Sequence, residues 1–508
     1  MFKTDALILL VNSMTKAEKK RFRSYSRKSD YMTLFDIIDK NKSIAQDELK
    51  NKFKQEGNKK TSASFDITVN YLYKLILDSL LALREEYDHH FLLLNKLLKS
   101  RILFEKSLYD EALEMIEQVK NTAGKYENQY ILIYAASLEL DYLLSLNFQN
   151  VSETDLLNRH SKINAAIKML RIANEQSALF ELLKHRMIYK GNIRSKTQID
   201  ALNDLVISEM SLIASSNAET LEIKKLHQLF QANYLIYTGD YNSALRSFHE
   251  LNRLFEENPL LWANPPIYYV QVLEGILDTL RSIRKYDELP YFTEQLKKMQ
   301  NLPKNFQTGI DALVFLYDLL PLLDKGDFQS SLKLINNHHN DVLDKIHLLN
   351  PARQAEVYLY TALVHFGNND YHKAQKALRQ VIIKGKTFYT LPLFRTIRLV
   401  NLMVNYETGD FDMIQYESRS IIREISRNEK MYHTEHLMLR FVSKPPQILV
   451  PIQRTKMWEK ISPELDKIRN DIYEIQILKI FDFTAWIESK LRRIPLGKIL
   501  AEKNNLLT

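Results

Sequence analysis

The phrase TGDYNSAL, residues 238–245, decides the fold of this 508-residue chain because close variants of it recur along the sequence. Its order is a glycine or asparagine, an acid, an aromatic residue and then the start of an apolar stripe. Clear variants are KGDFQSSL (325–332), NNDYHKAQ (368–375) and TGDFDMIQ (408–415), with weaker echoes in SLYDEAL (107–113) and RKYDEL (284–289). Such recurrence predicts an array of repeated supersecondary units.

The aromatic residues of the phrase measure the repeat length. From Tyr241 onward, successive aromatics lie 40 to 45 residues apart, and the gap from Tyr109 to Tyr241 is 132 residues, about three repeats. Two degenerate units are therefore expected near 150–157 and 195–202. The aromatic positions are Tyr109, Tyr241, Tyr286, Phe328, Tyr371 and Phe411. The spacing predicts about eight stacked helix pairs.

The residues around Tyr371 indicate that each unit is a helix pair. Apolar residues from Ala355 to Phe366 recur at three- and four-residue steps, which is one face of a helix. A second such stripe runs from Tyr371 to Val381. Between them, glycine or asparagine permits the positive φ that ends a helix, and the acid caps the next one. Neither helix can bury its stripe alone, so the pairs are expected to stack.

The stretch GDYNSALRSF (239–248), with Ala232 seven residues before its glycine, resembles a tetratricopeptide repeat (TPR). The likeness covers roughly residues 91–440, although the spacing is longer than the usual 34 residues. The resemblance implies an all-α, right-handed solenoid that binds proteins or peptides along a concave face. Asn233 and Tyr237 are the candidate contacts on that face, and no carboxylate-binding clamp is expected because apolar leucines occupy the equivalent positions in neighbouring units.

Composition agrees with a helical protein. The chain has only 11 Gly and 13 Pro, which is few for a protein built from β-turns. It has no Cys, so disulfides and thiolate metal sites are excluded, and a reducing cytoplasmic location is expected. No apolar run approaches the roughly 18 residues of a membrane span.

No catalytic or cofactor-binding constellation emerges. Glu86 with His89, and His433 with His436, have helical spacing for two metal ligands, but each pair lacks the further ligands that a site needs. SMTK (13–16) matches a serine–lysine motif without its companion elements. The sequence therefore predicts a protein that is not an enzyme and has no cofactor or metal.

Positive charge is concentrated at the beginning of the chain. The first 60 residues carry fifteen Lys or Arg and eight Asp or Glu, so they hold +7 of the net charge of +8. Thr15 and Glu18 predict a capping box that starts a helix, on which basic side chains align on one face. These candidate contacts to a polyanion or an acidic partner are Lys16, Lys20, Arg23 and Arg27. A solvated helix face is the alternative interpretation.

Residues 31–88 predict three further helices, in an outline similar to helix-turn-helix domains. The third is apolar along much of its length, as in a buried helix, which argues against a DNA-reading helix. At the other end, 443–463 is expected to be a connector. A final helix is expected from Pro463, with Leu465, Ile468, Ile472 and Ile475 on one face, to cap the array or fold back on it.

These observations predict a basic helical domain at 1–90, a TPR-like repeat array at 91–440 and a connector with C-terminal helices at 441–508. The expected function is a non-enzymatic scaffold or adaptor for a protein or peptide partner in the cytoplasm. The alternative is a nucleic-acid-associated regulator that binds through residues 15–28 and senses a partner with its repeats. Neither the partner nor the oligomeric state is readable from the sequence.

Overall fold

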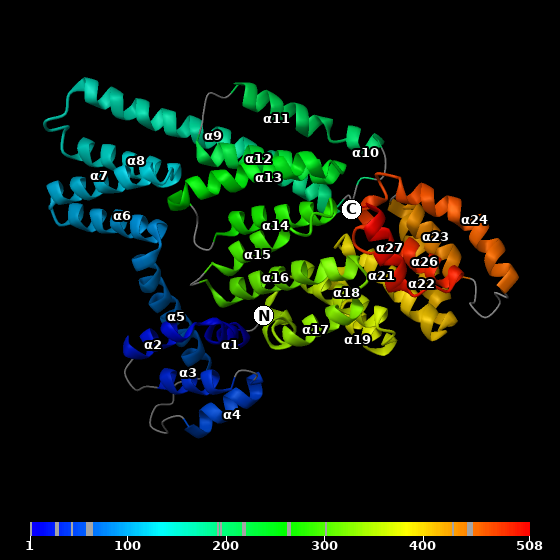
Figure 1. Cartoon of the computed structure of the whole chain (residues 1–508). Helices are drawn as coiled ribbons and strands as arrows, with labels where there is room; N and C mark the ends of the chain where they lie inside the picture. The colour runs from blue at the N-terminus through cyan, green and yellow to red at the C-terminus, as the bar shows by residue number, and fades with distance from the viewer. Residues whose placement is uncertain are drawn as a thin grey trace. The chain divides into compact units, whose positions relative to one another are not determined.

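The computed structural model describes the chain outside twelve short stretches. These are 1–2, 26–29, 42–43, 57–64, 190–192, 194–195, 216–219, 262–265, 300–301, 429–430, 444–450 and 508. The described residues form helices and no β-strand, as the sequence predicted (Figure 1).

The chain divides into two compact units. The first contains 1–171, and the second contains 172–262, 266–300 and 308–508, with the short stretches 263–265 and 301–307 assigned to the first. The boundary between 171 and 172 lies inside one long helix, Glu153–Tyr189. The three-part division expected from the sequence, with boundaries near residues 90 and 440, remains a prediction.

The helices of the first unit, together with the long helix that continues into the second, are α1 Lys3–Ser13, α2 Lys16–Tyr25, α3 Asp30–Lys40, α4 Gln46–Glu56, α5 Phe65–Tyr87, α6 His89–Glu105, α7 Tyr109–Lys125, α8 Gln129–Ser145 and α9 Glu153–Tyr189. The helices of the second unit begin with α10 Lys196–Asp200, α11 Asn203–Ser215, α12 Leu221–Thr238, α13 Tyr241–Glu257, η1 Pro259–Leu261, α14 Ile267–Ser282, α15 Leu289–Lys297, α16 Lys304–Asp324, α17 Phe328–Asn337, η2 His339–Leu343 and η3 Ile346–Leu348. They continue with α18 Pro351–Gly367, α19 Tyr371–Ile382, α20 Gly385–Phe388, α21 Leu393–Thr408, α22 Phe411–Asn428, α23 His433–Val442, α24 Pro451–Arg469, α25 Ile475–Leu478, α26 Phe483–Arg492 and α27 Leu496–Leu507.

In the first unit, α1, α2, α3, α4 and α5 surround a core that includes Leu7, Phe22, Phe35 and Leu72. The three helices expected between 31 and 88 are therefore present as α3, α4 and α5. The expectation that the third is mostly buried holds only for part of it, since Leu77 and Leu81 are exposed. After α5, the helices α6, α7 and α8 pack on one another in order.

In the second unit, helices pack in consecutive pairs. Among them, α12 packs on α13, α18 on α19 and α21 on α22, and α13 also packs on α14 (Figure 1). Each pair buries the apolar stripes that neither helix could bury alone. The all-helical fold with packed helix pairs is compatible with a helical repeat solenoid.

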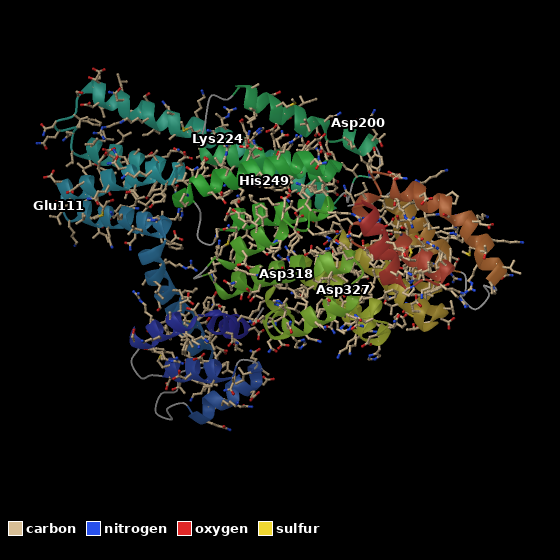
Figure 2. The ribbon with its side chains drawn as sticks, in the orientation of Figure 1. Glu111, Asp200, Lys224, His249, Asp318 and Asp327 are labelled. Atoms are coloured by element: carbon tan, nitrogen blue, oxygen red, sulfur yellow. The ribbon has the colours of Figure 1, made fainter. Side chains whose placement is uncertain are left out.

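The four clear copies of the repeated phrase close their helix pairs as expected, whereas the weaker copies at 107–113 and 284–289 have no acid cap. Gly239, Gly326 and Gly409 have φ angles of 88°, 73° and 76°, the left-handed conformation that ends the first helix. The acid then caps the second helix, as at Asp327, which Figure 2 labels. Its carboxylate accepts a hydrogen bond from the Ser330 amide at 3.0 Å. Asp240, Asp370 and Asp410 make the equivalent bonds.

Aromatic residues pack between neighbouring helix pairs. A methyl group added at Gly275 of α14 would lie 2.2 Å from the ring of Phe248, and one at Gly367 would lie 2.1 Å from Phe328. Each ring therefore occupies the space that a side chain would need at the glycine, which lies on the first helix of the next pair. Among the predicted wedges, Tyr241 and Phe328 are buried, while Tyr371 and Phe411 are only half-buried.

Between the two expected degenerate units, 153–189 is one continuous helix, α9, of 37 residues. The expectation for the C-terminal helix is wrong. The last expected helix begins at Pro451, not at Pro463, and ends at Arg469. Because the chain turns there, Ile472 lies off the buried stripe of Leu465 and Ile468 and is 56% exposed.

Helix α16 is long and apolar enough to span a membrane by length and composition. The qualifying window, Asn305–Asp324, has a mean hydropathy of 1.4, and 61% of it is buried inside the protein. This pattern is typical of a core helix. No other helix in the described residues meets the same length and hydropathy criteria.

Candidate functional site

The second unit has an inner face that its own C-terminal region covers. We define the inner face as the sides of α12, α14, α21 and α23 that contact 471–504. One end of this region, residues 471–481, is called the C-terminal strap. At the other end, Gly497 lies against the backbone of Gly326, and the Trp486 indole donates to Glu407 at 2.8 Å. The C-terminal region therefore folds back on the array.

Arg281 of α14 joins several helices to the strap. Its guanidinium donates to Asp324 of α16 at 2.9 and 3.0 Å, to the Tyr360 hydroxyl of α18 at 3.2 Å, and to the Lys479 carbonyl at 2.7 Å. Burial disfavours the charged form, but Asp324 and Tyr360 outweigh it and raise the pKa of Arg281 well above its ordinary value. A permanent buried cation thus bonds to the strap backbone.

Carboxylates gather beside this cation. Arg353 pairs with Glu274 of α14 at 2.5 Å and with Glu356 of its own helix at 2.5 Å. Burial, together with the charges of Glu274 and Asp278, raises the pKa of Glu356, although Arg353 opposes this. Crowded carboxylates with too few cations favour a positively charged neighbour.

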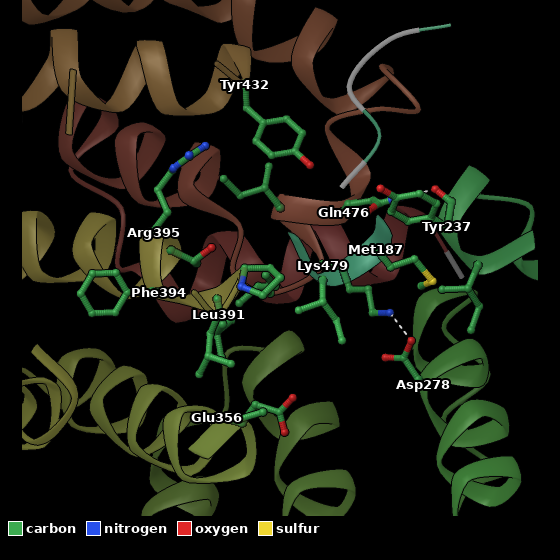
Figure 3. Close-up of a pocket in the computed structure, with 18 of the residues that line it drawn as sticks. Met187, Tyr237, Asp278, Glu356, Leu391, Phe394, Arg395, Tyr432, Gln476 and Lys479 are labelled. Atoms are coloured by element: carbon green, nitrogen blue, oxygen red, sulfur yellow. Dashed lines mark hydrogen bonds and ion pairs between the residues drawn. The ribbon is translucent and has the colours of Figure 1, made fainter. Parts of the chain in front are cut away.

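The Lys479 side chain is such a neighbour. Its ammonium lies 2.6 Å from the Asp278 carboxylate and 5.3 Å from the centre of the Tyr241 ring (Figure 3). An ion pair with a cation–π contact is the arrangement by which proteins hold a lysine side chain. The inner face therefore binds a lysine delivered by a separate segment of the same chain.

A cavity of about 570 Å³ lies beside the strap (Figure 3). One side is formed by the strap residues Gln476 and Lys479, and the rest by α12, α14, α18, α21 and the residues around them. The wall combines aromatic, aliphatic and charged side chains, among them Glu356, Tyr389, Leu391, Phe394, Arg395 and Tyr432. Its size and mixed lining suit a few side chains of a peptide.

The two residues predicted for a concave face have different positions. Tyr237 borders the cavity, and its carbonyl accepts a hydrogen bond from Gln476 at 3.0 Å. Asn233 is buried, and its side chain accepts from Lys184 at 2.6 Å and donates to the Leu229 carbonyl at 2.7 Å. Burial lowers the pKa of Lys184. Asn233 therefore helps to hold the wall of the site.

Sequence reasoning missed the charged residues of α14. Glu274, Asp278 and Arg281 are spaced by four and three residues within an otherwise apolar helix. That spacing places all three on one helical face, which is the signal that could have found them. Lys479 offered no comparable signal because its partners lie about two hundred residues away in sequence.

The basic residues of α2 are not equivalent. Lys16 and Lys20 are exposed. Arg23 pairs with Asp36 at 3.0 Å and Asp39 at 2.5 Å, and Lys19 pairs with Asp39 at 2.6 Å. Burial of Asp39 is outweighed by Lys19 and Arg23, which lower its pKa. Part of the basic stripe is thus bound to α3, and Arg27 lies outside the described residues.

The two histidine pairs contact other groups. The His89 ring stacks on Tyr126, with its Nε2 atom 2.8 Å from the tyrosine hydroxyl. The backbone amide of His433 donates to Glu474 at 2.7 Å. Within the described part of the chain, no three His, Asp or Glu side chains are grouped to hold a metal ion.

In comparisons with known proteins, no family model and no curated protein sequence matches the chain. The candidate site therefore rests on its own geometry.

Proposed function

We propose that the protein is a non-enzymatic interaction scaffold whose inner face binds a segment of a partner protein. One observation carries this proposal: the inner face already holds a chain segment by an ion pair, by a hydrogen bond to its backbone, by a hydrogen bond from its Gln476 side chain and by apolar packing of Tyr473. These are the interactions by which helical grooves bind peptides. The cavity beside the strap provides room for further side chains.

A right-handed, TPR-like superhelix belongs to the same proposal. It is supported by burial of the residues that carry the TPR resemblance, namely Ala232, Tyr241, Ala244 and Phe248. A cytoplasmic location also belongs to it and is supported by the absence of cysteine.

Affinity purification from the native cell, with and without nuclease, tests the scaffold. The informative variant is Tyr389→Asp, because Tyr389 borders the cavity and its side chain is exposed, so the charge should not unfold the protein. Tyr416→Asp is the matched control, since Tyr416 is exposed on α22 away from the cavity. We expect nuclease-resistant protein partners that Tyr389→Asp loses and Tyr416→Asp retains.

The alternative function, a nucleic-acid-associated regulator, is supported by the exposed Lys16 and Lys20. The same purification distinguishes the scaffold function from the regulator function. Recovery of nucleic acid, with partners that disappear after nuclease treatment and do not respond to Tyr389→Asp, would support the regulator over the scaffold.

A further inference from the structure

The C-terminal strap contacts the inner face in the way a bound peptide would. Its Gln476 amide donates to the Tyr237 carbonyl at 3.0 Å, its Lys479 ammonium binds Asp278, and its Lys479 carbonyl accepts from Arg281. The Tyr473 ring joins the apolar cluster around Phe230 and Tyr237. Side chains and backbone of the strap are therefore both recognised.

Glu474 of the strap anchors a different helix. Its carboxylate accepts hydrogen bonds from the amides of His433 and Thr434, at 2.7 and 3.0 Å, and from the Thr434 hydroxyl at 2.7 Å. A negative charge at the first amides of α23 satisfies donors that the helix leaves unpaired and complements its dipole. This cap comes from a segment 40 residues further along the chain.

The strap does not hold its own conformation. Its helix, α25, has four residues, and isolated helices shorter than about 12 residues are marginal in water. The inner face therefore imposes the conformation of the strap. What keeps the strap in place is therefore its contacts with the inner face, and another segment that makes the same contacts can replace it.

We propose that the C-terminal strap is an intramolecular ligand, and that the partner presents a short segment of the same chemistry which displaces it. The spacing of Glu474, Gln476 and Lys479 defines this chemistry: a glutamate, a glutamine two residues later and a lysine three residues after that, with apolar residues between them. This proposal rests on the scaffold function and specifies its partner.

The tethered strap sets the affinity of the partner. A tethered ligand acts at an effective concentration of roughly millimolar, so the free segment has to compete with it. The observed affinity falls in proportion to the fraction of molecules whose inner face is open. Weakening the strap without changing the inner face should therefore strengthen partner binding.

A synthetic peptide of residues 470–482, labelled with fluorescein, is the probe. The receptors are the full chain and its double variant Gln476→Ala/Lys479→Ala, in which Glu474 is kept because it caps α23. We expect the variant to bind the peptide at least about tenfold more tightly than the unchanged chain. A double variant that keeps its melting curve but gains no affinity overturns the proposal.

A charge exchange tests the lysine contact. In the peptide, the lysine that corresponds to Lys479 is replaced by glutamate, and Asp278→Lys is added to the double variant. The altered peptide should lose binding to the double variant and regain it with Asp278→Lys. Equal binding of both peptides to the double variant would exclude recognition of the lysine at Asp278 and overturn the proposal.

Hydrogen exchange on the unchanged chain provides a test that does not depend on variants. Saturating peptide should accelerate amide exchange in 471–481, whereas the glutamate peptide should leave it unchanged. Unaltered exchange at saturation contradicts displacement. The scaffold function is judged separately: if a partner requires Tyr389 but the double variant captures no more of it than the unchanged chain, the strap proposal alone fails.

Discussion

The helix pairs of the two units differ in what covers their first helices. In the second unit, α12 and α14 contact the C-terminal strap through Gln476 and Lys479. In the first unit, α6 and α8 leave large apolar side chains exposed, among them Leu98, Ile102 and Tyr130. The repeated phrase therefore determines how a pair closes but not what its first helix contacts, because that depends on a segment far away in the sequence.

The same contrast appears at the aromatic position of the phrase. Tyr241 in the second unit is 8% exposed, whereas Tyr109 in the first is 38% exposed. Tyr241→Ala should lower the free energy of unfolding by about 3–5 kcal/mol, as for other buried aromatic residues. Tyr109→Ala should cost no more than about 1 kcal/mol.

Urea denaturation measures both changes. Trp458 and Trp486 lie in the second unit, so their fluorescence follows that unit, while far-ultraviolet circular dichroism follows both. Equal losses for the two variants would remove the distinction between buried and exposed aromatics and leave the phrase equivalent in both units.

Two half-buried carboxylates, one in each unit, should differ because only Asp482 also caps a helix. Burial of Asp482 in the second unit is outweighed by Lys503, Thr484 and Arg469, which lower its pKa. Asp482 also caps α26 by accepting from the Ala485 amide at 2.9 Å. Asp482→Asn should cost about 1–3 kcal/mol at neutral pH. The matched change Asp39→Asn, in a half-buried ion-pair network of the first unit that caps no helix, should cost less than about 1 kcal/mol.

The pH dependence of the Asp482→Asn cost shows whether the charge of Asp482 stabilises the folded state. A carboxylate whose pKa is lower in the folded state contributes stability that is fully present above its unfolded pKa, about 3.9, and is lost as the pH falls through the folded value. The cost of Asp482→Asn should therefore shrink steadily below about pH 4. A cost that is constant down to acid unfolding would assign the role of Asp482 to packing instead of charge.

Whether a contact could be predicted from the sequence depends on how far apart its two residues lie in the chain. The cap between Asp240 and Ser243 spans three residues, so its pattern is visible in the phrase itself. The contact between Tyr237 and Gln476 spans 239 residues, and the helix propensity of neither segment reveals it. The charges of Glu274, Asp278 and Arg281 could have indicated a polar face on α14, but not which segment they bind.

Within the second unit, Glu356 should respond to pH in the opposite sense to Asp482. Burial, Glu274 and Asp278 raise its pKa, so its ionisation costs stability above the folded pKa and costs nothing below the unfolded one. Glu356→Gln should therefore stabilise the unit modestly at neutral pH, and this gain should vanish below about pH 4. Tryptophan fluorescence in urea across a pH series measures it, and destabilisation at neutral pH would show that the pairing with Arg353 outweighs burial.

The smallest effect concerns polyanion binding by the first unit. Lys16 and Lys20 are exposed, whereas Lys19 and Arg23 are paired with Asp36 and Asp39. If Lys16 and Lys20 contact phosphates, replacing both with alanine should reduce the slope of log affinity for duplex DNA against log salt by about 1.8, or roughly 0.9 for each contact.

Replacing Lys19 and Arg23 with alanine is the matched control, because it removes the same charge from the same helix. That variant should keep the original slope, since its cations already bind carboxylates of α3. Binding is measured over a salt series for the unchanged chain and both double variants, with Arg27 left in place. Identical slopes for all three would mean that α2 is a solvated face, and the first unit would then have no part in recognising nucleic acid through these four residues. A larger loss from Lys19 and Arg23 would mean that the ion pairs with α3 open when DNA binds.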